Sequence, residues 1–333
     1  MKDTIVVIGT LITVAAIGWL IDTASKRKRE KAIESQIFNC LEEAAKNGKA
    51  YAQYEIGRWY LEYKDANSSF FWIGKAAEQG IAEAQYNLGV MYQQGLGVTQ
   101  DYQQAAKWHE KAAEQGLAEA QYNLGVMYQR GLGVTQDYQQ AAKWFSKAAE
   151  QRNAMAQYSL GFMYRHDLGV TRDDKQAVKW YEKAAEQGIA EAQSNLGVMY
   201  HQGLGVTQNY QQAAKWFSKA AEQGFAMAQL NLGLMHYDGL GVTQDYQQAV
   251  KWFSKAAKQG NAEAQLRLGM LYFLGRGVLQ NYKQAYAWIL VATANGHGMG
   301  DEMLDAVATE LTPATLAAAQ ALAGSYFEKY QAR

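Results

Sequence analysis

A block of 36 residues recurs along this chain almost unchanged, and it constrains the fold more than any other feature. One copy runs from Ala84 to Gly116, and a series of tryptophans keeps the same spacing. These are Trp72, Trp108, Trp144, Trp180, Trp216, Trp252 and Trp288. A fixed period of this length indicates stacked helical units, a solenoid. Because a solenoid offers an extended surface more readily than an enclosed pocket, we expect recognition rather than catalysis.

Each repeat reads as two antiparallel helices joined by a short loop. The first, helix A, is expected over residues 82–94, where apolar side chains recur at helical spacing. The second, helix B, is expected over residues 101–115, and Asp101 with Gln104 forms a capping box at its start. A glycine in the middle of helix A, such as Gly89, predicts a close approach by a neighbouring helix or a tryptophan ring.

Three repeats depart from the pattern at loop positions. Where the others close helix B with a glycine, one has Arg152, so that either Asn153 or Arg152 must take the left-handed conformation. Asp167 replaces a glycine between the helices of the fourth repeat. The first repeat is four residues short and has Lys64 in its loop. We expect the loops at Asp167 and Lys64 to differ in shape from the rest.

The repeated pattern A-x-Y-x-L-G-x-x-Y, then G-x-G-V, D-Y and W-x-x-K-A-A, resembles the Sel1-like repeats, which are related to the tetratricopeptide repeats. The resemblance covers about residues 51–296 as seven units. It implies an all-α fold, an α/α superhelical solenoid, and a role as an adaptor for protein partners.

The organisation expected from the sequence has four parts. Residues 1–29 form a membrane anchor with a basic flank, and residues 30–50 form a capping helix. Residues 51–296 form the repeat solenoid, and residues 297–333 form closing helices. Capping helices are expected because the terminal repeats of a solenoid would otherwise leave an apolar face open.

The N-terminal segment differs in kind from the repeats. Residues 5–21 are 17 residues without a charge, long enough to span about 25 Å as a helix, near the lower limit for a transmembrane segment. A basic cluster follows at residues 26–29. An uncleaved anchor fits better than a signal peptide, which needs small residues at a cleavage site where Asp22 stands. The basic flank predicts cytoplasmic repeats, at a bacterial inner membrane by the resemblance; the alternative is a periplasmic or secreted protein.

In the tetratricopeptide class helix A lines the concave face, so the resemblance places a partner there. One outward position of helix A is asparagine in several repeats, and asparagine can donate and accept hydrogen bonds to an extended peptide. Its residues are Asn87, Asn123, Ser159, Asn195, Asn231 and Arg267. Alternatively, each asparagine bonds to a neighbouring repeat or to water. The fourth and sixth repeats are the most individual and add the candidate contacts Arg165, His166, His236 and Tyr237.

Composition and residue spacing give little support to other kinds of site. The chain has 32 lysines and arginines against 32 aspartates and glutamates, so no global charge directs it to nucleic acid. Its five histidines are scattered, and no metal-ligand spacing is present. We expect His109 to be a packed or hydrogen-bonded imidazole, Cys40 to be buried, and the lysines of helix B to form a solvated face. No catalytic residue, cofactor or small-molecule substrate is expected.

The sequence therefore predicts a membrane-tethered scaffold that binds a protein partner or an extended segment on the concave face of helix A, and not an enzyme. An exported periplasmic or secreted scaffold that acts on envelope or host proteins is the alternative within this class. A hydrolase of cell-wall or β-lactam substrates is the alternative from another class, because some related repeat proteins have been given that role.

Overall fold

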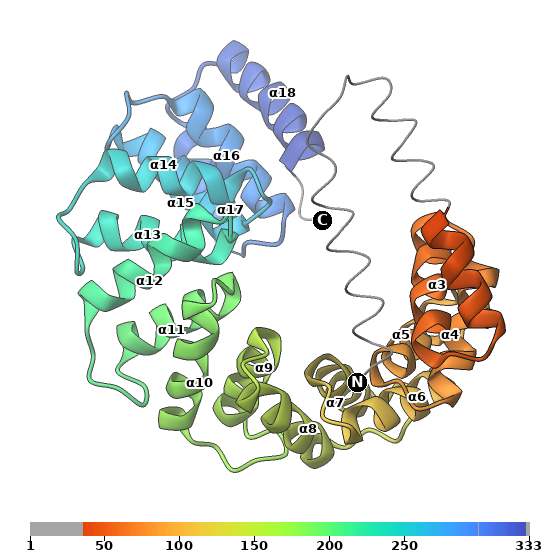
Figure 1. Cartoon of the computed structure of the whole chain (residues 1–333). Coiled ribbons are helices and arrows are strands. Elements are labelled where there is room, and N and C mark those ends of the chain that lie inside the picture. Colours follow the sequence, from red (N-terminus) through yellow and green to blue (C-terminus); the bar gives the residue numbers. More distant parts are fainter. Residues whose placement is uncertain (1–35, 299, 331–333) are drawn as a thin grey trace, which may run out of the picture. The chain divides into compact units, whose positions relative to one another are not determined.

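The computed structural model describes residues 36–298 and 300–330, and every regular element among them is helical. They fall into two compact units, unit 1 ending at Gln136 and unit 2 beginning at Asp137. Figure 1 shows the helices of each unit in chain order. The expected anchor, residues 5–21, lies outside the described residues. No helix in the part of the chain that the structure describes is long and apolar enough to cross a membrane.

The helices alternate between the two expected types. Unit 1 contains a helix over residues 36–46, then α3 (Ala50–Glu62), α4 (Ala66–Glu78), α5 (Ala82–Gln94), α6 (Tyr102–Glu114) and α7 (Ala118–Arg130). Unit 2 contains α8 (Tyr138–Glu150), α9 (Ala154–His166), α10 (Asp174–Glu186), α11 (Ala190–Gln202), α12 (Tyr210–Glu222), α13 (Ala226–Asp238), α14 (Tyr246–Ala257), α15 (Ala262–Leu274), α16 (Tyr282–Ala294), α17 (Gly300–Ala308) and α18 (Pro313–Tyr330). Odd numbers from α3 to α15 are A helices, and even numbers from α4 to α16 are B helices.

Each B helix begins at a side-chain cap. In α6 the carboxylate of Asp101 accepts a hydrogen bond from the backbone N–H of Gln104 at 3.0 Å, which satisfies a free first-turn donor. The N–H of Asp101 itself donates to the carbonyl of Tyr92 at 2.9 Å. The predicted cap is therefore confirmed, but the loop backbone takes the place of the reciprocal bond of a capping box.

The left-handed position after α8 falls on Arg152. Its φ is 67°, whereas Asn153 has a φ of −65° and caps α9 by accepting the N–H of Ala156 at 2.9 Å. Asparagine is excluded from the left-handed position because its extended backbone is needed for that cap.

Replacing Arg152 with glycine is expected to raise the free energy of unfolding of unit 2 by about 1 kcal/mol, since a left-handed backbone costs an L-residue about 1–2 kcal/mol. Urea titration followed by circular dichroism measures it. The converse substitution, Gly188→Arg at a φ of 93° with open space around it, should destabilise by a similar amount. Equal unfolding midpoints for the wild type and the two variants would show that the left-handed backbone of Arg152 is not strained.

Of the two loops that we expected to differ in shape from the rest, only the loop of the first repeat does so. Asp167 has φ 58° and ψ 40°, close to the 72° and 34° of Gly95, so the fourth repeat keeps the common loop backbone and our expectation of a different shape was wrong there. The first loop is shorter, because α3 ends at Glu62 and α4 begins at Ala66, with Lys64 at a φ of 62°.

The core forms where a B helix packs onto the A helix of the same repeat. A Cβ added to Gly233 of α13 would lie 2.6 Å from Cδ1 of Phe253, so the glycine admits that ring. The predicted close approach is confirmed, but the ring is the residue after the tryptophan. Trp216 packs instead with Leu196 and Met199 of its own repeat and with α10, the B helix of the repeat before it. The tryptophans thus join neighbouring repeats within unit 2.

The lysines of the B helices, which we expected to form a solvated face, also contact the tryptophan rings. Lys111 places its ammonium group 4.0 Å from the ring centroid of Trp108, and the equivalent distance from Lys219 to Trp216 is 4.2 Å. Such cation–π contacts contribute about 0.5–1 kcal/mol at exposed sites. In the last repeat α18 takes over this role, with Tyr326 at 4.5 Å from the ring of Trp288.

At the N-terminal side of unit 1, the helix over residues 36–46 packs like a B helix. Ala45 is buried beside Ala52 and Ile56, and its carbonyl accepts a hydrogen bond from Gln53 at 3.0 Å. Cys40 is exposed on this helix, so the expectation of a buried cysteine was wrong. Cys40 stands where later repeats have tryptophan, and no A helix precedes it among the described residues to cover it.

Candidate functional site

A row of buried glutamines holds neighbouring repeats in register, and we did not predict it from the sequence. Gln193 of α11 donates to the carbonyl of Ala185 at 3.0 Å and accepts from the side chain of Gln223 at 2.8 Å. Ala185 lies in the last turn of α10, and its carbonyl also accepts the backbone N–H of Gly188 at 3.1 Å, so the glutamine is an additional donor to it. The same donor bond to an alanine carbonyl is made by Gln53, Gln85, Gln121, Gln157, Gln229 and Gln265. This row positions each A helix against the repeat before it.

Replacing Gln193 with leucine is expected to lower the free energy of unfolding of unit 2 by about 2 kcal/mol, because two side-chain hydrogen bonds are lost together, one to the carbonyl of Ala185 and one from Gln223. Denaturant titration of the variant measures the loss. The control is Gln211→Leu, at an exposed position of α12, which should change stability by less than about 0.5 kcal/mol. Equal losses in the two variants would exclude a special role for the buried amide.

The predicted asparagines of the A helices are half-buried, and three of them bond to tyrosines. Asn87 donates to the hydroxyl of Tyr54 at 3.5 Å, and the side chain of Asn123 hydrogen-bonds to Tyr86 of the preceding repeat. Burial raises the pKa of both tyrosines, and these hydrogen bonds oppose that rise. In unit 2, Asn195 bonds to Tyr181, the core ring of the fourth repeat. These contacts match the alternative in which asparagine joins neighbouring repeats, and peptide binding by them stays a prediction.

A pocket of about 410 Å³ lies at the N-terminal side of unit 1 and includes one predicted contact, Asn87. It is lined by Leu41, Glu55, Arg58, Trp59, Leu61, Glu62 and Asn87. Arg58 pairs with Glu55 at 3.3 Å and is exposed, while Trp59 supplies a large apolar wall. Apolar walls with a few polar groups are typical of ligand-binding clefts. A second pocket, of about 240 Å³, lies beside α6 and is lined in part by Lys107, Glu110 and Tyr128.

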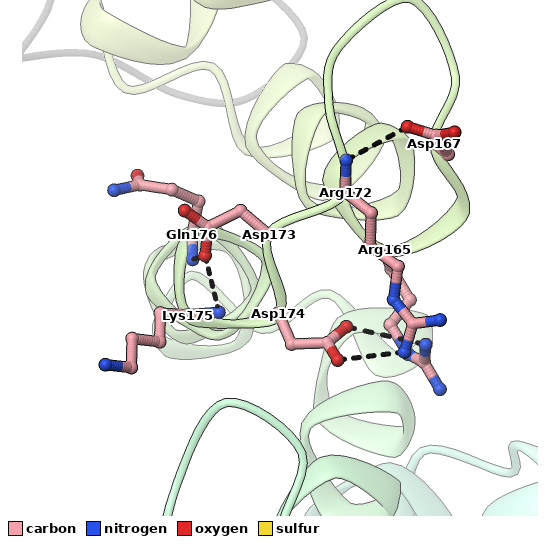
Figure 2. Close-up of polar contacts among 7 residues, drawn as sticks. All are labelled: Arg165, Asp167, Arg172, Asp173, Asp174, Lys175 and Gln176. Carbon is pink, nitrogen blue, oxygen red and sulfur yellow. Dashed lines mark hydrogen bonds and ion pairs between the residues drawn. The ribbon is translucent and has the colours of Figure 1, made fainter.

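In the fourth repeat the predicted contact Arg165 belongs to an ion-pair cluster, drawn in Figure 2. Arg165 and Arg172 both reach Asp174, at 3.4 and 2.9 Å. Asp167 accepts the backbone N–H of Arg172 at 3.0 Å. His166 is exposed next to this cluster. Desolvation and the two arginines lower its pKa, because all three disfavour the imidazolium form.

This cluster replaces a neutral contact that other repeats make. In the fifth repeat Gln208 donates to the hydroxyl of Tyr210 at 3.1 Å. The fourth repeat has Arg172 and Asp174 at those two positions, so the pair has changed on both sides. The ion pairs of Arg165 and Arg172 with Asp174 stabilise the loop. The carboxylate offsets part of the positive charge of the two arginines, so that only the rest is available to a partner protein.

The remaining candidates lie in different surroundings of unit 2. Ser159 and Asn231 are half-buried. Arg267 pairs with Glu263 at 2.6 Å, and His297 contacts the other oxygen of that carboxylate at 2.7 Å. Burial raises the pKa of Glu263, but the hydrogen bonds from His297 and Arg267 outweigh it and lower the pKa overall.

The two candidates of the sixth repeat, His236 and Tyr237, are adjacent but face different groups. The Tyr237 hydroxyl accepts a hydrogen bond from Arg276 at 3.0 Å. Nδ1 of His236 is buried and has no hydrogen-bond partner. The structure therefore does not bring the ten predicted contacts into one site. Over residues 36–298 and 300–330, no group of three histidine, cysteine or acidic side chains is placed to hold a metal ion.

Comparison with known proteins identifies the family of the repeats. The Sel1 repeat family model matches seven consecutive segments: residues 50–81, 82–117, 118–153, 154–189, 190–225, 226–261 and 262–297. The fold thus defines a helical-repeat protein of the kind that serves as a protein–protein interaction scaffold. The chain belongs to the Sel1 repeat family, as its repeated motif led us to expect.

Two solved structures illustrate the similarity. A Sel1 repeat protein from Oxalobacter formigenes is 33% identical, with 72% of this chain and 96% of that chain covered at a TM-score of 0.64. A protective antigen of uropathogenic Escherichia coli strains, with an SLR fold, is 31% identical, with 87% of this chain and 86% of that chain covered at a TM-score of 0.51. No curated protein matches the chain.

Proposed function

We propose that this protein is a membrane-tethered scaffold that holds a segment of a partner protein against its A helices. The observation that carries the proposal is the pocket beside Trp59, which contains Asn87 and is lined by two A helices, α3 and α5, and by Leu41 of the helix over residues 36–46. Its mixture of an apolar wall, both charge signs and an amide suits a peptide, which presents apolar side chains and backbone hydrogen-bonding groups together. Membership of the Sel1 repeat family supports a binding role.

Photocrosslinking in cells tests where the partner binds. A photoreactive amino acid replaces Arg58, which is exposed in the pocket, and captured proteins are identified by mass spectrometry. The control site is Lys215, exposed on the B helix α12. The proposal expects a protein captured at the Arg58 site and absent at the Lys215 site. Equal capture at both sites, or none at the Arg58 site, would contradict it.

The asparagines are tested on the captured partner. We expect Asn123→Ala with Asn195→Ala to weaken binding by about tenfold, since each lost hydrogen bond is worth about 1 kcal/mol and 1.4 kcal/mol is a factor of ten. Titration calorimetry measures the affinity. Because both asparagines also bond to tyrosines, the variants must first show wild-type thermal unfolding. Unchanged affinity in the double variant would remove the asparagines from the binding surface.

Location is a separate part of the proposal. The tether is residues 5–21, and the basic flank favours repeats in the bacterial cytoplasm. The alternative, an exported scaffold, gains support from the E. coli relative, which is described as a protective antigen. A reporter fused after Arg333 separates the two, and periplasmic activity of that reporter would reverse the proposed orientation.

A further inference from the structure

We infer, resting on the proposed function, that the partner segment held in the pocket beside Trp59 is basic and places one lysine or arginine side chain in that pocket. Two carboxylates and one guanidinium line the pocket, those of Glu55, Glu62 and Arg58. One carboxylate is therefore in excess, and a cation of the partner would balance it.

The excess carboxylate belongs to Glu62. Arg58 pairs with Glu55 at 3.3 Å, and its guanidinium also lies 5.6 Å from the ring centroid of Tyr54. Glu62 is exposed, and none of the ion pairs among the described residues includes it. It is thus a pocket-lining carboxylate whose charge is available to a partner.

The surroundings of the pocket are negative as well. Tyr51 is 58% exposed, and its ring centroid lies 6.3 Å from that of Tyr54. The pKa of Tyr51 is raised, chiefly by the negative charge of Glu55 and next by burial. Glu83 of α5 adds to the rise and Arg58 opposes it. The two carboxylates outweigh the guanidinium at Tyr51, so an approaching cation is attracted to this side of unit 1.

The pocket also has an apolar wall that suits the stem of a long cationic side chain. Leu41, Trp59 and Leu61 form this wall, and the volume of about 410 Å³ leaves room for a long side chain. Lysine and arginine bury their methylene groups along apolar surface while the charged head stays in water. The stem would lie on the wall and the head would reach the exposed carboxylate of Glu62. A purely apolar or an acidic side chain would satisfy only one of these two features.

The repeat architecture does not require the charges of α3. Glu55, Arg58 and Glu62 stand at positions that carry no charge in α5. Those positions of α5 are Asn87, Val90 and Gln94. The buried face of α3 is retained, because Ile56 is 0% exposed next to the buried Gly57. The first repeat has therefore changed the side of its A helix that the core does not use, which is where a partner would bind.

Random peptides test the chemistry of the bound segment without a known partner. A phage library that displays short random peptides is selected on the full chain in a non-ionic detergent. The selected protein carries a photoreactive amino acid in place of Leu61, which is 39% exposed and lines the pocket. Only peptides that crosslink at that position on illumination are sequenced, so each of them is a pocket binder.

Two matched charge reversals test the role of Glu62. Glu62→Lys and Glu114→Lys change the net charge equally, and each replaces an exposed glutamate at the last residue of a unit 1 helix, α3 or α6. Because a cation is favoured at a helix C-terminus, both variants should unfold at the wild-type temperature or above it, which circular dichroism checks. Glu62→Gln removes the charge without reversing it and serves as the milder variant.

A basic segment predicts that lysine and arginine are enriched in the pocket binders over the unselected library. Glu62→Lys should weaken the binding of a selected synthetic peptide by about tenfold, and Glu62→Gln by about threefold, because an attractive pair becomes repulsive or is lost. Glu114→Lys should change the affinity by less than about twofold. Exchanging the basic residue of the peptide for glutamate should restore its binding to the Glu62→Lys protein. Fluorescence anisotropy with the full chain measures each affinity.

The possible failures of the basic segment and of the pocket differ from each other. Pocket binders without an excess of basic residues, or with equal affinity for wild type and Glu62→Lys, would overturn the basic segment and leave the proposed function standing. Equal weakening by Glu62→Lys and Glu114→Lys would assign the effect to overall charge and would also overturn it. If no peptide crosslinks at the Leu61 position, the pocket holds no segment, and the proposed function is contradicted together with the inference.

Discussion

Gly241→Ala is expected to lower the free energy of unfolding of unit 2 by about 4 kcal/mol or more. Gly241 lies in the loop between α13 and α14 with a φ of 71°, and an added Cβ would overlap the carbonyl group of Tyr210, the first residue of α12. The overlap is with backbone, which cannot rotate away as a side chain can. The loop would have to leave the preceding repeat, and the nearest-neighbour interface that stabilises a solenoid would be lost.

Comparison with Gly224 separates the steric overlap at Gly241 from the conformational cost of a positive φ. Gly224 has a φ of 92° but no atom within 4 Å of an added Cβ, so Gly224→Ala should cost only the conformational penalty of about 1–2 kcal/mol. Urea titration with tryptophan fluorescence follows both variants through Trp216 and Trp252, which are buried in unit 2. Similar losses for the two alanine variants would show that the close approach at Gly241 contributes nothing.

His109→Phe is expected to stabilise unit 1 and to flatten its dependence on pH. The imidazole is fully buried against Gly89, neither ring nitrogen has a hydrogen-bond partner, and burial lowers the pKa to about 4. An unsatisfied buried donor costs about 1–3 kcal/mol, so the phenylalanine found at this position in other repeats should be more stable at pH 7. The prediction of a packed or hydrogen-bonded imidazole is confirmed in its first form, because the ring is packed and makes no hydrogen bond.

The sign of the pH effect follows from the direction of the shift. Because the folded-state pKa lies below the ordinary histidine value of 6.5, the unfolded chain binds a proton that the folded chain excludes between about pH 6.5 and pH 4. Stability therefore falls as pH falls through this window, by about 3 kcal/mol in total. Denaturation at several pH values should show this loss in wild type and not in His109→Phe. His201→Phe, at a half-buried position in unit 2, is the control, and an equal pH slope in wild type and His109→Phe would refute the explanation.

The glutamine row shows where sequence reasoning stopped short. Gln85 is polar, and the helical pattern alone places polar residues outside, yet it is 5% exposed. A signal was available, because glutamine recurs at this position in every repeat although the adjacent surface residues vary. Its meaning depended on the partner, the carbonyl of Ala77, which lies in the last turn of a different helix. Only the packed pair of repeats shows that this carbonyl, which already accepts the N–H of Gly80 at 3.0 Å, also accepts the side chain of Gln85.

At the glycine and asparagine positions of helix A, too, the sequence predicted one part of the contact and the packing decided the other. Sequence periodicity predicted that Gly89 admits a close neighbour, but not whether that neighbour is Trp108 or His109. These two side chains point about 100° apart on one helix, so the crossing of α5 and α6 decides which one meets the glycine. The asparagine of helix A was visible as a recurrent polar position, whereas its bond to a tyrosine depends on how the next repeat packs.

By itself, the sequence determined the helical pairs, their number, their caps and the family, because those features depend on local periodicity and on residue types repeated at fixed spacing. The tertiary structure alone decided which polar side chains are buried and which ring fills each glycine gap. Those outcomes depend on contacts between different helices, from 8 positions apart for Gln193 and Ala185 to 33 for Asn87 and Tyr54, whose geometry is set by helix crossing and not by any local pattern.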